Sequence, residues 1–322
     1  MLYKKRTMPN ELKGLLSLTR RLPASHEKQS EIQKELYQYK AGYEGEQEYD
    51  KYMTEFTPAY PHAILHDLYL KQNGFYFQID SLLITPSEIV VTEVKNYSYK
   101  TVITSSPTQF IKVYPNGDRK VVRNPIVEVE RKIHFLQQWL KSRNIDIPIS
   151  GLIIFKHDNE IEFQNSEPEM KIAFTYEAPS YFRELNVQNE ILKKQMIAKL
   201  SREMLQQHKE YTISPLTEKY GIDINDITPG VICPNCDRIG MQWAKKKWNC
   251  AHCQHSGQTE HQKAVEDWFL LIQPKMTNRE FRYFTKIDNR HVARGLLAKT
   301  NLQVIGERKA AHYIFKKEFA AQ

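Results

Sequence analysis

Two runs of apolar side chains within residues 75–97 dominate the hydropathy pattern of the chain. Both runs are rich in aromatic and β-branched residues, and the turn formers Thr85, Pro86, Ser87 and Glu88 separate them. This pattern predicts a β-hairpin. Because both strands are apolar on both faces, we expect the hairpin to lie in the centre of a covered sheet.

Helical and extended patterns alternate on either side of this hairpin. Asn124 can cap a helix that has Pro125 at its first position, and the apolar residues that follow recur at helical spacing. The expected elements, in chain order, are a helix at 25–54, a strand at 60–70, the hairpin at 75–97, a second hairpin within 101–123, a helix at 126–142 and a strand at 147–155. This order predicts an α/β core with a mixed central sheet flanked by helices.

Three charged residues interrupt the apolar hairpin, Asp80 on its first strand and Glu93 and Lys95 on its second. Burying a charge without a partner is costly, so we expect these groups to pair with one another or with a metal ion. Glu93 and Lys95 share a face because they are two residues apart on a strand, and the hairpin can bring Asp80 beside Glu93. Two carboxylates suit Mg²⁺ or Mn²⁺, and an adjacent ammonium can hold a metal-bound water. A structural salt bridge, or an edge strand whose charges face water, is the alternative interpretation.

These residues resemble the active-site core of a nuclease superfamily. Ile79-Asp80 and Thr92-Glu93-Val94-Lys95-Asn96 are similar to the PD-(D/E)xK motif and, more narrowly, to that of the nuclease-related domain (NERD) family. Two further motifs of that family occur in order, Gly42-Tyr43-Glu44-Gly45-Glu46 before the hairpin and Asn124-Pro125 after it. The resemblance covers residues 38–156, about a third of the chain. One residue departs from it, because Glu128 stands where the family often has Gln.

The resemblance implies a restriction-endonuclease-like core and a nuclease that depends on Mg²⁺ or Mn²⁺. Asp80 and Glu93 would bind the metal together with the backbone carbonyl of Val94. Lys95 would position or deprotonate the attacking water, while the metal stabilises the charge that develops on the phosphate. Glu46 would approach the metal from its helix as an outer or third carboxylate. The alternative for Glu46 is an ordinary solvated helix face, since its neighbours are also acidic.

All four cysteines of the chain fall into two Cys-x-x-Cys pairs, Cys233 with Cys236 and Cys250 with Cys253, with thirteen residues between the pairs. Each pair can present two thiolates to one tetrahedral ion, so the spacing predicts a structural Zn²⁺ held by four sulfurs. A redox dithiol would explain only one of the pairs. Four sulfur ligands leave no open coordination position, so we do not expect this zinc to be catalytic.

Basic and aromatic residues are interleaved between the two cysteine pairs, at Trp243, Lys245, Lys246, Lys247 and Trp248. Such a mixture suits phosphate contacts and base stacking, so we expect the three lysines and Trp248 to bind nucleic acid. The alternative is that one or both tryptophans cover the zinc site of a module that is too small to have a core.

The C-terminal residues predict a small helical unit. Helices are expected at 264–271, at 278–287 and through residue 297, followed by a hairpin within 303–315, and Thr277 with Glu280 has the signature of a capping box. This order resembles a winged helix-turn-helix. On that resemblance the basic residues of the recognition helix and the wing are Arg290, His291, Arg294, Arg308 and Lys309. The alternative is a plain helical module that docks on the core or dimerises.

The whole formal net charge of +8 lies in the last third of the chain, because residues 230–322 contain 16 Lys and Arg but 8 Asp and Glu. A basic module joined to a neutral one suggests that the C-terminal part holds a polyanion. No run approaches the ~20 apolar residues of a membrane span, and no secretory signal is recognisable, so we expect a cytoplasmic protein. The expected domains are a nuclease-like domain at 1–185, a helix and linker at 186–230, a zinc ribbon at 231–258 and a helical, winged-helix-like module at 259–322.

Three functional hypotheses follow. The first is a divalent-metal-dependent nuclease acting on DNA, with the zinc ribbon and C-terminal module holding the substrate. The second is a non-catalytic protein that binds nucleic acid or a protein partner on a nuclease-like scaffold, although the intact set of Asp80, Glu93 and Lys95 favours chemistry. The third is an RNase, since nothing in the sequence identifies recognition of a 2′-hydroxyl. Endonuclease and exonuclease activity, and a homo-oligomer or protein partner formed through the C-terminal module, are all compatible with the sequence.

Overall fold

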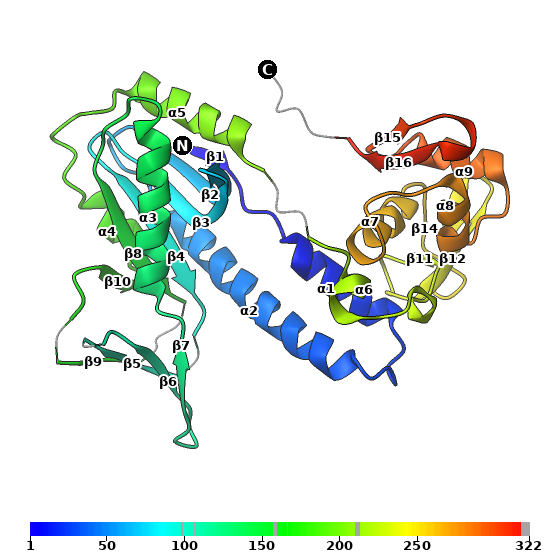
Figure 1. Ribbon diagram of the computed structural model, residues 1–322, viewed down its shortest axis with the longest axis horizontal. Coiled ribbons are helices and arrows are strands. Elements are labelled where there is room, and N and C mark those ends of the chain that lie inside the picture. Colours follow the sequence, from blue (N-terminus) through cyan, green and yellow to red (C-terminus); the bar gives the residue numbers. More distant parts are fainter. Residues whose placement is uncertain (98, 106, 157–159, 166, 210–212, 317–322) are drawn as a thin grey trace. The chain divides into compact units, whose positions relative to one another are not determined.

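The computed structural model describes residues 1–97, 99–105, 107–156, 160–165, 167–209 and 213–316. The chain divides into two compact units, each built from two separate segments (Figure 1). Unit 1 comprises Met1–Thr7 and Lys40–Tyr211, and unit 2 comprises Met8–Tyr39 and Thr212–Gln322. Helix α2 (Gln29–Met53) contributes its first part to unit 2 and its second part to unit 1.

A six-stranded mixed sheet forms the centre of unit 1. Its strands, in spatial order, are β1 (Leu2–Lys4), β2 (Ala63–Gln72), β3 (Phe75–Ile84), β4 (Ile89–Lys95), β8 (Ile149–Phe155) and β10 (Lys171–Phe174). The pairs β2–β3 and β3–β4 are antiparallel, whereas β1–β2, β4–β8 and β8–β10 are parallel. The mixed α/β fold expected from the sequence is confirmed, and β3 and β4 occupy the two central positions.

Helices cover both faces of this sheet. On one face, α3 (Pro125–Lys141) and α5 (Lys194–Gln207) bury residues such as Leu136 and Leu200 against the strands. On the other, α2 and α4 (Ala178–Arg183) contribute Tyr49 and Phe182. Helix α3 begins as predicted, since the Asn124 side chain accepts a hydrogen bond from the amide of Ile126 and Pro125 is the first helical residue.

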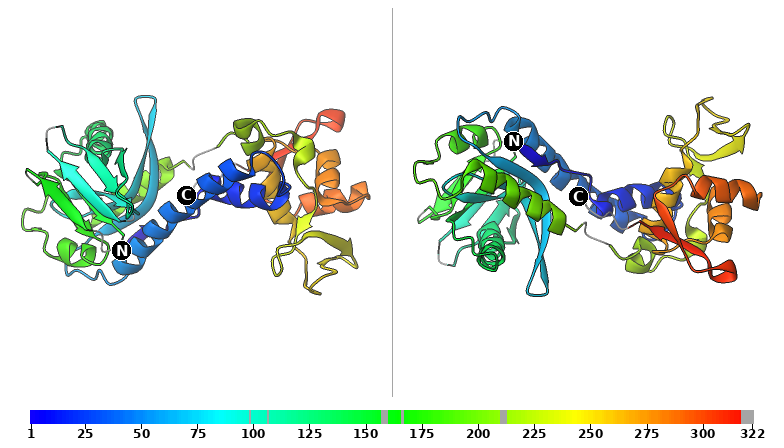
Figure 2. Two further views of the ribbon diagram at one scale, coloured as in Figure 1. Left: turned by 90° about the horizontal axis from the view of Figure 1, so that it is seen from below. Right: turned by 90° about the horizontal axis from the view of Figure 1, so that it is seen from above.

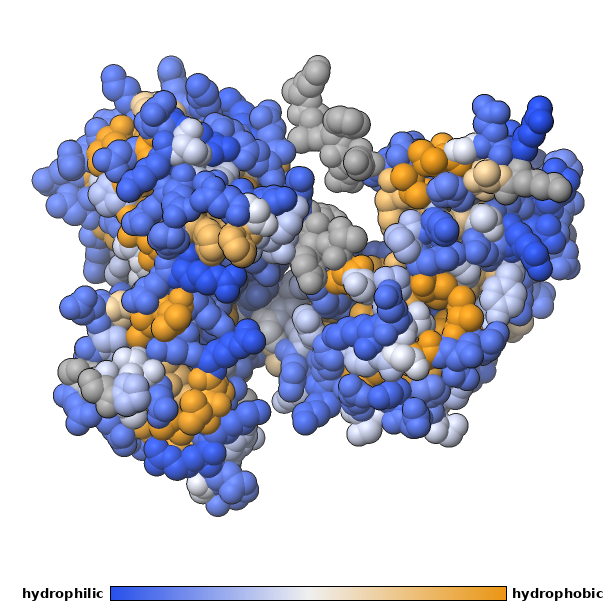
Figure 3. Space-filling model, in the orientation of Figure 1, coloured by the Kyte–Doolittle hydropathy of each residue, from blue (hydrophilic) through white to orange (hydrophobic). Residues whose placement is uncertain are grey.

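The β2–β3 hairpin is longer than its covered part. Its tip extends beyond the rest of the sheet (Figure 2), and Phe75 and Tyr76 are 64% and 40% exposed. The hairpin of β3 and β4 lies in the centre of the sheet as expected, but the start of β3 is exposed. In the view of Figure 3 the surface of the molecule is mainly hydrophilic, with apolar residues in separate groups.

A second, four-stranded sheet of unit 1 includes the second predicted hairpin. Its strands, in spatial order, are β7 (Arg119–Val122), β6 (Phe110–Val113), β5 (Lys100–Thr104) and β9 (Ile161–Gln164). The β6–β7 hairpin matches the prediction closely. Strand β9 was not expected, because its pairing with β5 joins parts of the chain that are sixty residues apart.

Unit 2 contains the cysteine-rich ribbon and all of the C-terminal helices. Its elements are α1 (Asn10–Arg21), α6 (Leu216–Tyr220), a 3₁₀ turn (Ile224–Asp226), β11 (Val231–Ile232), β12 (Ile239–Ala244), β13 (Lys247–Asn249), β14 (Ser256–Gly257), α7 (His261–Leu271), α8 (Asn278–Thr285), α9 (Arg290–Leu297), β15 (Leu302–Ile305), a 3₁₀ turn (Arg308–Ala310) and β16 (His312–Phe315). The capping box of α8 is present as predicted, between Thr277 and Glu280.

One hydrophobic core runs through unit 2, so the ribbon and the helical module are not separately packed. It includes Leu15 and Leu18 of α1, Cys233 and Trp248 of the ribbon, and Trp268 of α7. This differs from the domain boundaries expected from the sequence in two respects. Helix α1 packs with the C-terminal part rather than with the nuclease-like core. The expected linker also contributes buried residues, among them Leu216, Tyr220 and Ile227. The helix expected at the start of the segment 186–230 begins only at Lys194.

Candidate active site

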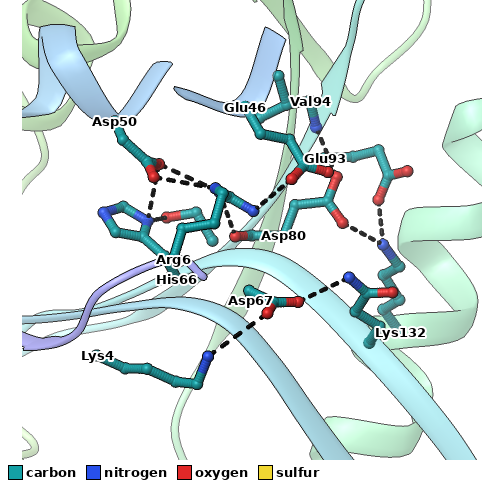
Figure 4. Close-up of polar contacts among 12 residues, drawn as sticks. Lys4, Arg6, Glu46, Asp50, His66, Asp67, Asp80, Glu93, Val94 and Lys132 are labelled. Carbon is teal, nitrogen blue, oxygen red and sulfur yellow. Dashed lines mark hydrogen bonds and ion pairs between the residues drawn. The ribbon is translucent and has the colours of Figure 1, made fainter. Parts of the chain in front are cut away.

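The central hairpin brings together the three charged residues that the sequence singles out. Asp80 and Glu93 are 7% and 5% exposed. The Lys95 ammonium is 2.7 Å from Glu93 Oε1, which confirms that these two side chains share a face of β4. Asp80 accepts a hydrogen bond of 3.0 Å from the amide of Val94 through Oδ2, so its carboxylate is fixed beside β4 (Figure 4).

An irregularity in β2 and β3 lies at the position of Asp80. Leu65 and Leu68 belong to the same core, and so do Ile79 and Leu82, although residues three apart on a regular strand point to opposite faces. Both strands therefore change face here, and Asp67 adopts a positive φ of 51°. The pairing of β2 with β3 keeps its register across this point, with His66 opposite Ser81 and Leu68 opposite Ile79.

Lys132 on α3 is the site residue that sequence reasoning missed. Its ammonium is 3.3 Å from Asp80 Oδ1 and also contacts Glu93 Oε2 (Figure 4), so one cation is shared by the two buried carboxylates. A signal was present, because Lys132 lies four residues after Glu128 and therefore on the same face of the helix. Glu128 itself accepts a 2.6 Å hydrogen bond from Lys95, which gives its carboxylate a role in holding this lysine.

A second set of charges is organised around Arg6, which follows β1. Its guanidinium binds Glu46 at 2.8 Å and Asp50 at 2.9 Å, both on α2, and donates a 2.8 Å hydrogen bond to the backbone carbonyl of Asp80. The Arg6 side chain is 3% exposed. Glu46 thus lies near Asp80 but is held by Arg6, a contact that no local motif of the sequence indicates.

The pKa values of these groups follow from burial and from their neighbours. Burial alone would raise the pKa of Asp80, but the charges of Lys132 and Lys95 and the amide of Val94 outweigh it and lower the pKa. Burial and the adjacent Asp80 raise the pKa of Glu93. Burial also raises the pKa of Glu46, to about 8, with Arg6 opposing and Asp80 reinforcing the shift.

His66 on β2 lies beside this network and is buried. Its Nδ1 is 3.0 Å from the Ser81 hydroxyl and 3.3 Å from Asp50 Oδ1. Burial, together with the positive charges of Arg6 and Lys4, lowers the pKa of His66 to about 3, so the ring is neutral at physiological pH.

Residues 41–156 match the family model of the nuclease-related domain. The chain contains a NERD domain. It begins in α2, ends with β8 and includes Glu46, Asp80, Glu93, Lys95 and Lys132. No curated protein and no solved structure matches the chain. Arg6 lies outside the matched residues, so a segment that precedes the NERD domain completes the polar network around Asp80.

The donor set of the NERD domain fits a divalent cation at Asp80 and Glu93. Both carboxylates are buried and converge on one positive charge, the ammonium of Lys132, and hard oxygen ligands suit Mg²⁺ or Mn²⁺. Within the part of the chain that the structure describes, three or more ligand atoms gather at one point only at the four cysteines. Glu46 is therefore not placed as a third ligand beside Asp80 and Glu93.

The four cysteines of unit 2 form a site that could hold a metal ion such as zinc, with their Sγ atoms all within 4.8 Å of one another. Cys233 and Cys253 are 3.5 Å apart and Cys236 and Cys250 are 3.7 Å apart. Tetrahedral zinc with bonds of about 2.3 Å separates its sulfur ligands by about 3.8 Å. The geometry agrees with the ribbon that the spacing predicts.

The basic residues predicted to bind nucleic acid in unit 2 are exposed, namely Lys245, Lys246, Lys247, Arg290, His291, Arg294 and Arg308. The side chain of Lys309 lies outside the described residues. Trp248 was predicted to stack on bases, and this is wrong because it is fully buried. Its indole N–H donates to His261 Nδ1 at 3.2 Å and its ring packs edge-on against Trp243. Trp248 belongs to the same core as Cys233 and Cys250, and this core extends beyond the ribbon, unlike that of the small module in the alternative interpretation. No helix within the described residues is long and apolar enough to cross a membrane.

Proposed function

We propose that the protein is a divalent-metal-dependent nuclease that hydrolyses phosphodiester bonds in DNA. The observation that carries the proposal is the convergence of Asp80 and Glu93, both buried, on one cation inside a NERD domain. A nuclease-related domain implies interaction with nucleic acid in general. The choice of DNA over RNA is part of the proposal.

Asp80, Glu93 and the carbonyl of Val94 would hold Mg²⁺ or Mn²⁺ in this mechanism. The metal would stabilise the negative charge that develops on the phosphate and the leaving oxygen. Burial tends to lower the pKa of Lys95, but Glu93 and Asp80 outweigh burial and raise it. We assign Lys95 the positioning of the attacking water, because Glu93 and Glu128 hold its ammonium beside the proposed metal ligands. Glu128 holds the Lys95 ammonium from the other side.

Lys132 has to leave the point between the two carboxylates when a metal binds there. Its side chain is 15% exposed and has several rotatable bonds, so it can swing toward the substrate phosphate. The exposed lysines and arginines of unit 2 and a structural Zn²⁺ at the four cysteines complete the proposal as a substrate-holding module.

A second candidate function is a nucleic-acid-binding protein without catalytic activity. It is favoured by the way in which Lys132 and Lys95 already compensate the charges of Asp80 and Glu93. In that case the NERD domain would serve as a binding scaffold.

Cleavage assays on linear, circular and single-stranded DNA and on RNA, with and without Mg²⁺ or Mn²⁺, test the proposal. The variants are Asp80→Asn, which keeps the shape of the side chain, and Asp146→Asn, an exposed control in unit 1. We expect metal-dependent cutting of DNA that Asp80→Asn lowers by more than about 100-fold and Asp146→Asn leaves unchanged. Cutting of the circle would identify an endonuclease. Binding of DNA without cleavage of any substrate would favour the second candidate.

A further inference from the structure

Two lysines stand on the core-facing side of the small sheet of unit 1. In the ladder of β5, β6 and β7, Ile103, Phe110 and Val122 lie in one row, directly across from one another. Ile103 and Phe110 are buried in the core of unit 1, and Val122 packs against it. The next row on the same side, two residues along, contains Lys112 directly opposite Lys120.

A like-charge pair in directly opposed positions destabilises a sheet, and within the described part of the chain no carboxylate neutralises this one. Neither lysine has a carboxylate within 4.0 Å among the described residues, whereas Lys100 of the same sheet pairs with Glu160 at 2.7 Å. The pair therefore calls for an explanation other than the stability of the fold.

Lys112 is also held in a fixed place next to the site. Its ammonium lies 4.0 Å from the centre of the Tyr97 ring, and Tyr97 follows Lys95 by two residues on the chain. Burial and the positive charges of Lys120 and Lys95 lower the pKa of Lys112, in keeping with its place between these two lysines. Lys112 thus stands between Lys95, which Tyr97 follows on the chain, and Lys120, its partner across the β6–β7 hairpin.

We propose that Lys112 and Lys120 bind the sugar–phosphate backbone of the nucleic-acid strand that enters the site, beside the bond to be cut. This inference rests on the proposed function. Phosphates are the partner that this pair lacks, because two adjacent ammonium groups match two negative charges along a strand. Ammonium groups that contact phosphates position the strand without identifying its bases, so this contact is independent of sequence.

The test compares Lys112→Gln/Lys120→Gln with a control, Lys193→Gln/Lys194→Gln, which neutralises two adjacent exposed lysines at the start of α5. Binding of a labelled DNA duplex is measured by fluorescence anisotropy between 50 and 500 mM salt, without added divalent metal. Two phosphate contacts contribute about 1.8 to the slope of log K against log salt. We expect the slope of the first variant to be smaller than that of wild type by this amount. The ratio of wild-type to variant affinity should then fall about 60-fold over the tenfold range of salt. The slope of the control should stay within error of wild type.

Lys120→Glu provides a second measurement. It gives Lys112 an opposite charge directly across the ladder, so the melting temperature should rise while DNA binding weakens further. A glutamine variant that is folded and keeps the wild-type salt slope would overturn the proposal, as would wild-type protein that binds no DNA.

The nuclease proposal and the proposal for Lys112 and Lys120 fail in different ways. Wild-type protein that binds DNA but cuts none would refute the nuclease, and the two salt slopes would still decide the role of Lys112 and Lys120. If the protein cuts DNA, we expect KM to rise in the glutamine variant and kcat to stay within about twofold of wild type. A KM equal to that of wild type would contradict the proposal while leaving the nuclease intact.

Discussion

Replacing Lys132 by Gln removes the cation that Asp80 and Glu93 share. The Lys132 ammonium is 3.3 Å from Asp80 and contacts Glu93, and both carboxylates are buried. Removing one partner of a buried ion pair costs about 3–5 kcal/mol, because the remaining charge is left uncompensated. Here Glu93 keeps Lys95 and Asp80 keeps the amide of Val94, so we expect a loss at the lower end, about 3 kcal/mol.

The assay is calorimetric unfolding without added divalent metal. For a unit of this size, 1 kcal/mol shifts the melting temperature by about 2–4 °C, so Lys132→Gln should lower it by about 6–12 °C. Lys141→Gln, at the exposed end of the same helix, is the control and should change it little.

Metal should reverse this loss. Mg²⁺ or Mn²⁺ placed between the two carboxylates replaces the missing charge, and in wild type it must first displace the ammonium. We therefore expect Lys132→Gln to bind Mn²⁺ more tightly in calorimetric titration and to gain more thermal stability from it than wild type. A variant as stable as the control without metal, or one whose Mn²⁺ affinity does not increase, would show that Lys132 is not a substitute for the metal.

Three further predictions concern the rest of the chain. Cys233→Ser should lose bound zinc and unfold unit 2, because Cys233 belongs to the same core as the C-terminal helices. Zinc content and limited proteolysis check this, and a variant that resists protease as well as wild type without bound metal would contradict it. Asp267→Asn should cost about 3–5 kcal/mol in denaturant unfolding, since it leaves the fully buried Arg21, 2.8 Å away, without its counter-charge; a change below about 1 kcal/mol would speak against a tightly coupled pair. His66 has a pKa of about 3 in the folded protein and about 6.5 when unfolded, so between these values only the unfolded state takes up its proton. The free energy of unfolding should therefore fall by up to about 1.4 kcal/mol per pH unit as the pH drops below about 6.5. His66→Gln should show a shallower decline in melting temperature between pH 7 and 5 than wild type. Equal declines in the two proteins would exclude His66 as the cause.

The parts of the fold that the sequence predicted are those fixed by local chemistry. The Thr85–Glu88 turn between two apolar runs, the Asn124 cap with Pro125 and the Thr277–Glu280 capping box each depend on a few neighbouring residues. The face shared by Glu93 and Lys95 followed from the period of a strand in the same way. These local rules were sufficient to place Asp80 and Glu93 on adjacent strands.

The parts that were missed depend on contacts between distant segments. Arg6 meets the carbonyl of Asp80 across 74 residues of sequence, and its own neighbourhood resembles an ordinary basic terminus. Lys132 was within reach of the same helical rule that relates it to Glu128, but its contact with Glu93 depends on how α3 packs on the sheet. Trp248 shows the limit of composition, since an aromatic residue between lysines suits a binding surface and an interior equally well until its neighbours are known.

The packing of α1 against α7 has a consequence for synthesis on the ribosome. Leu15 and Leu18 of α1 belong to the same core as Val265 and Trp268 of α7, about 250 residues later in the chain. At about 5–20 residues per second, the nascent chain carries the apolar face of α1 without its partner for roughly 12–50 seconds. During that interval the NERD domain can be completed, so α1 is the segment that a chaperone would have to protect while translation continues.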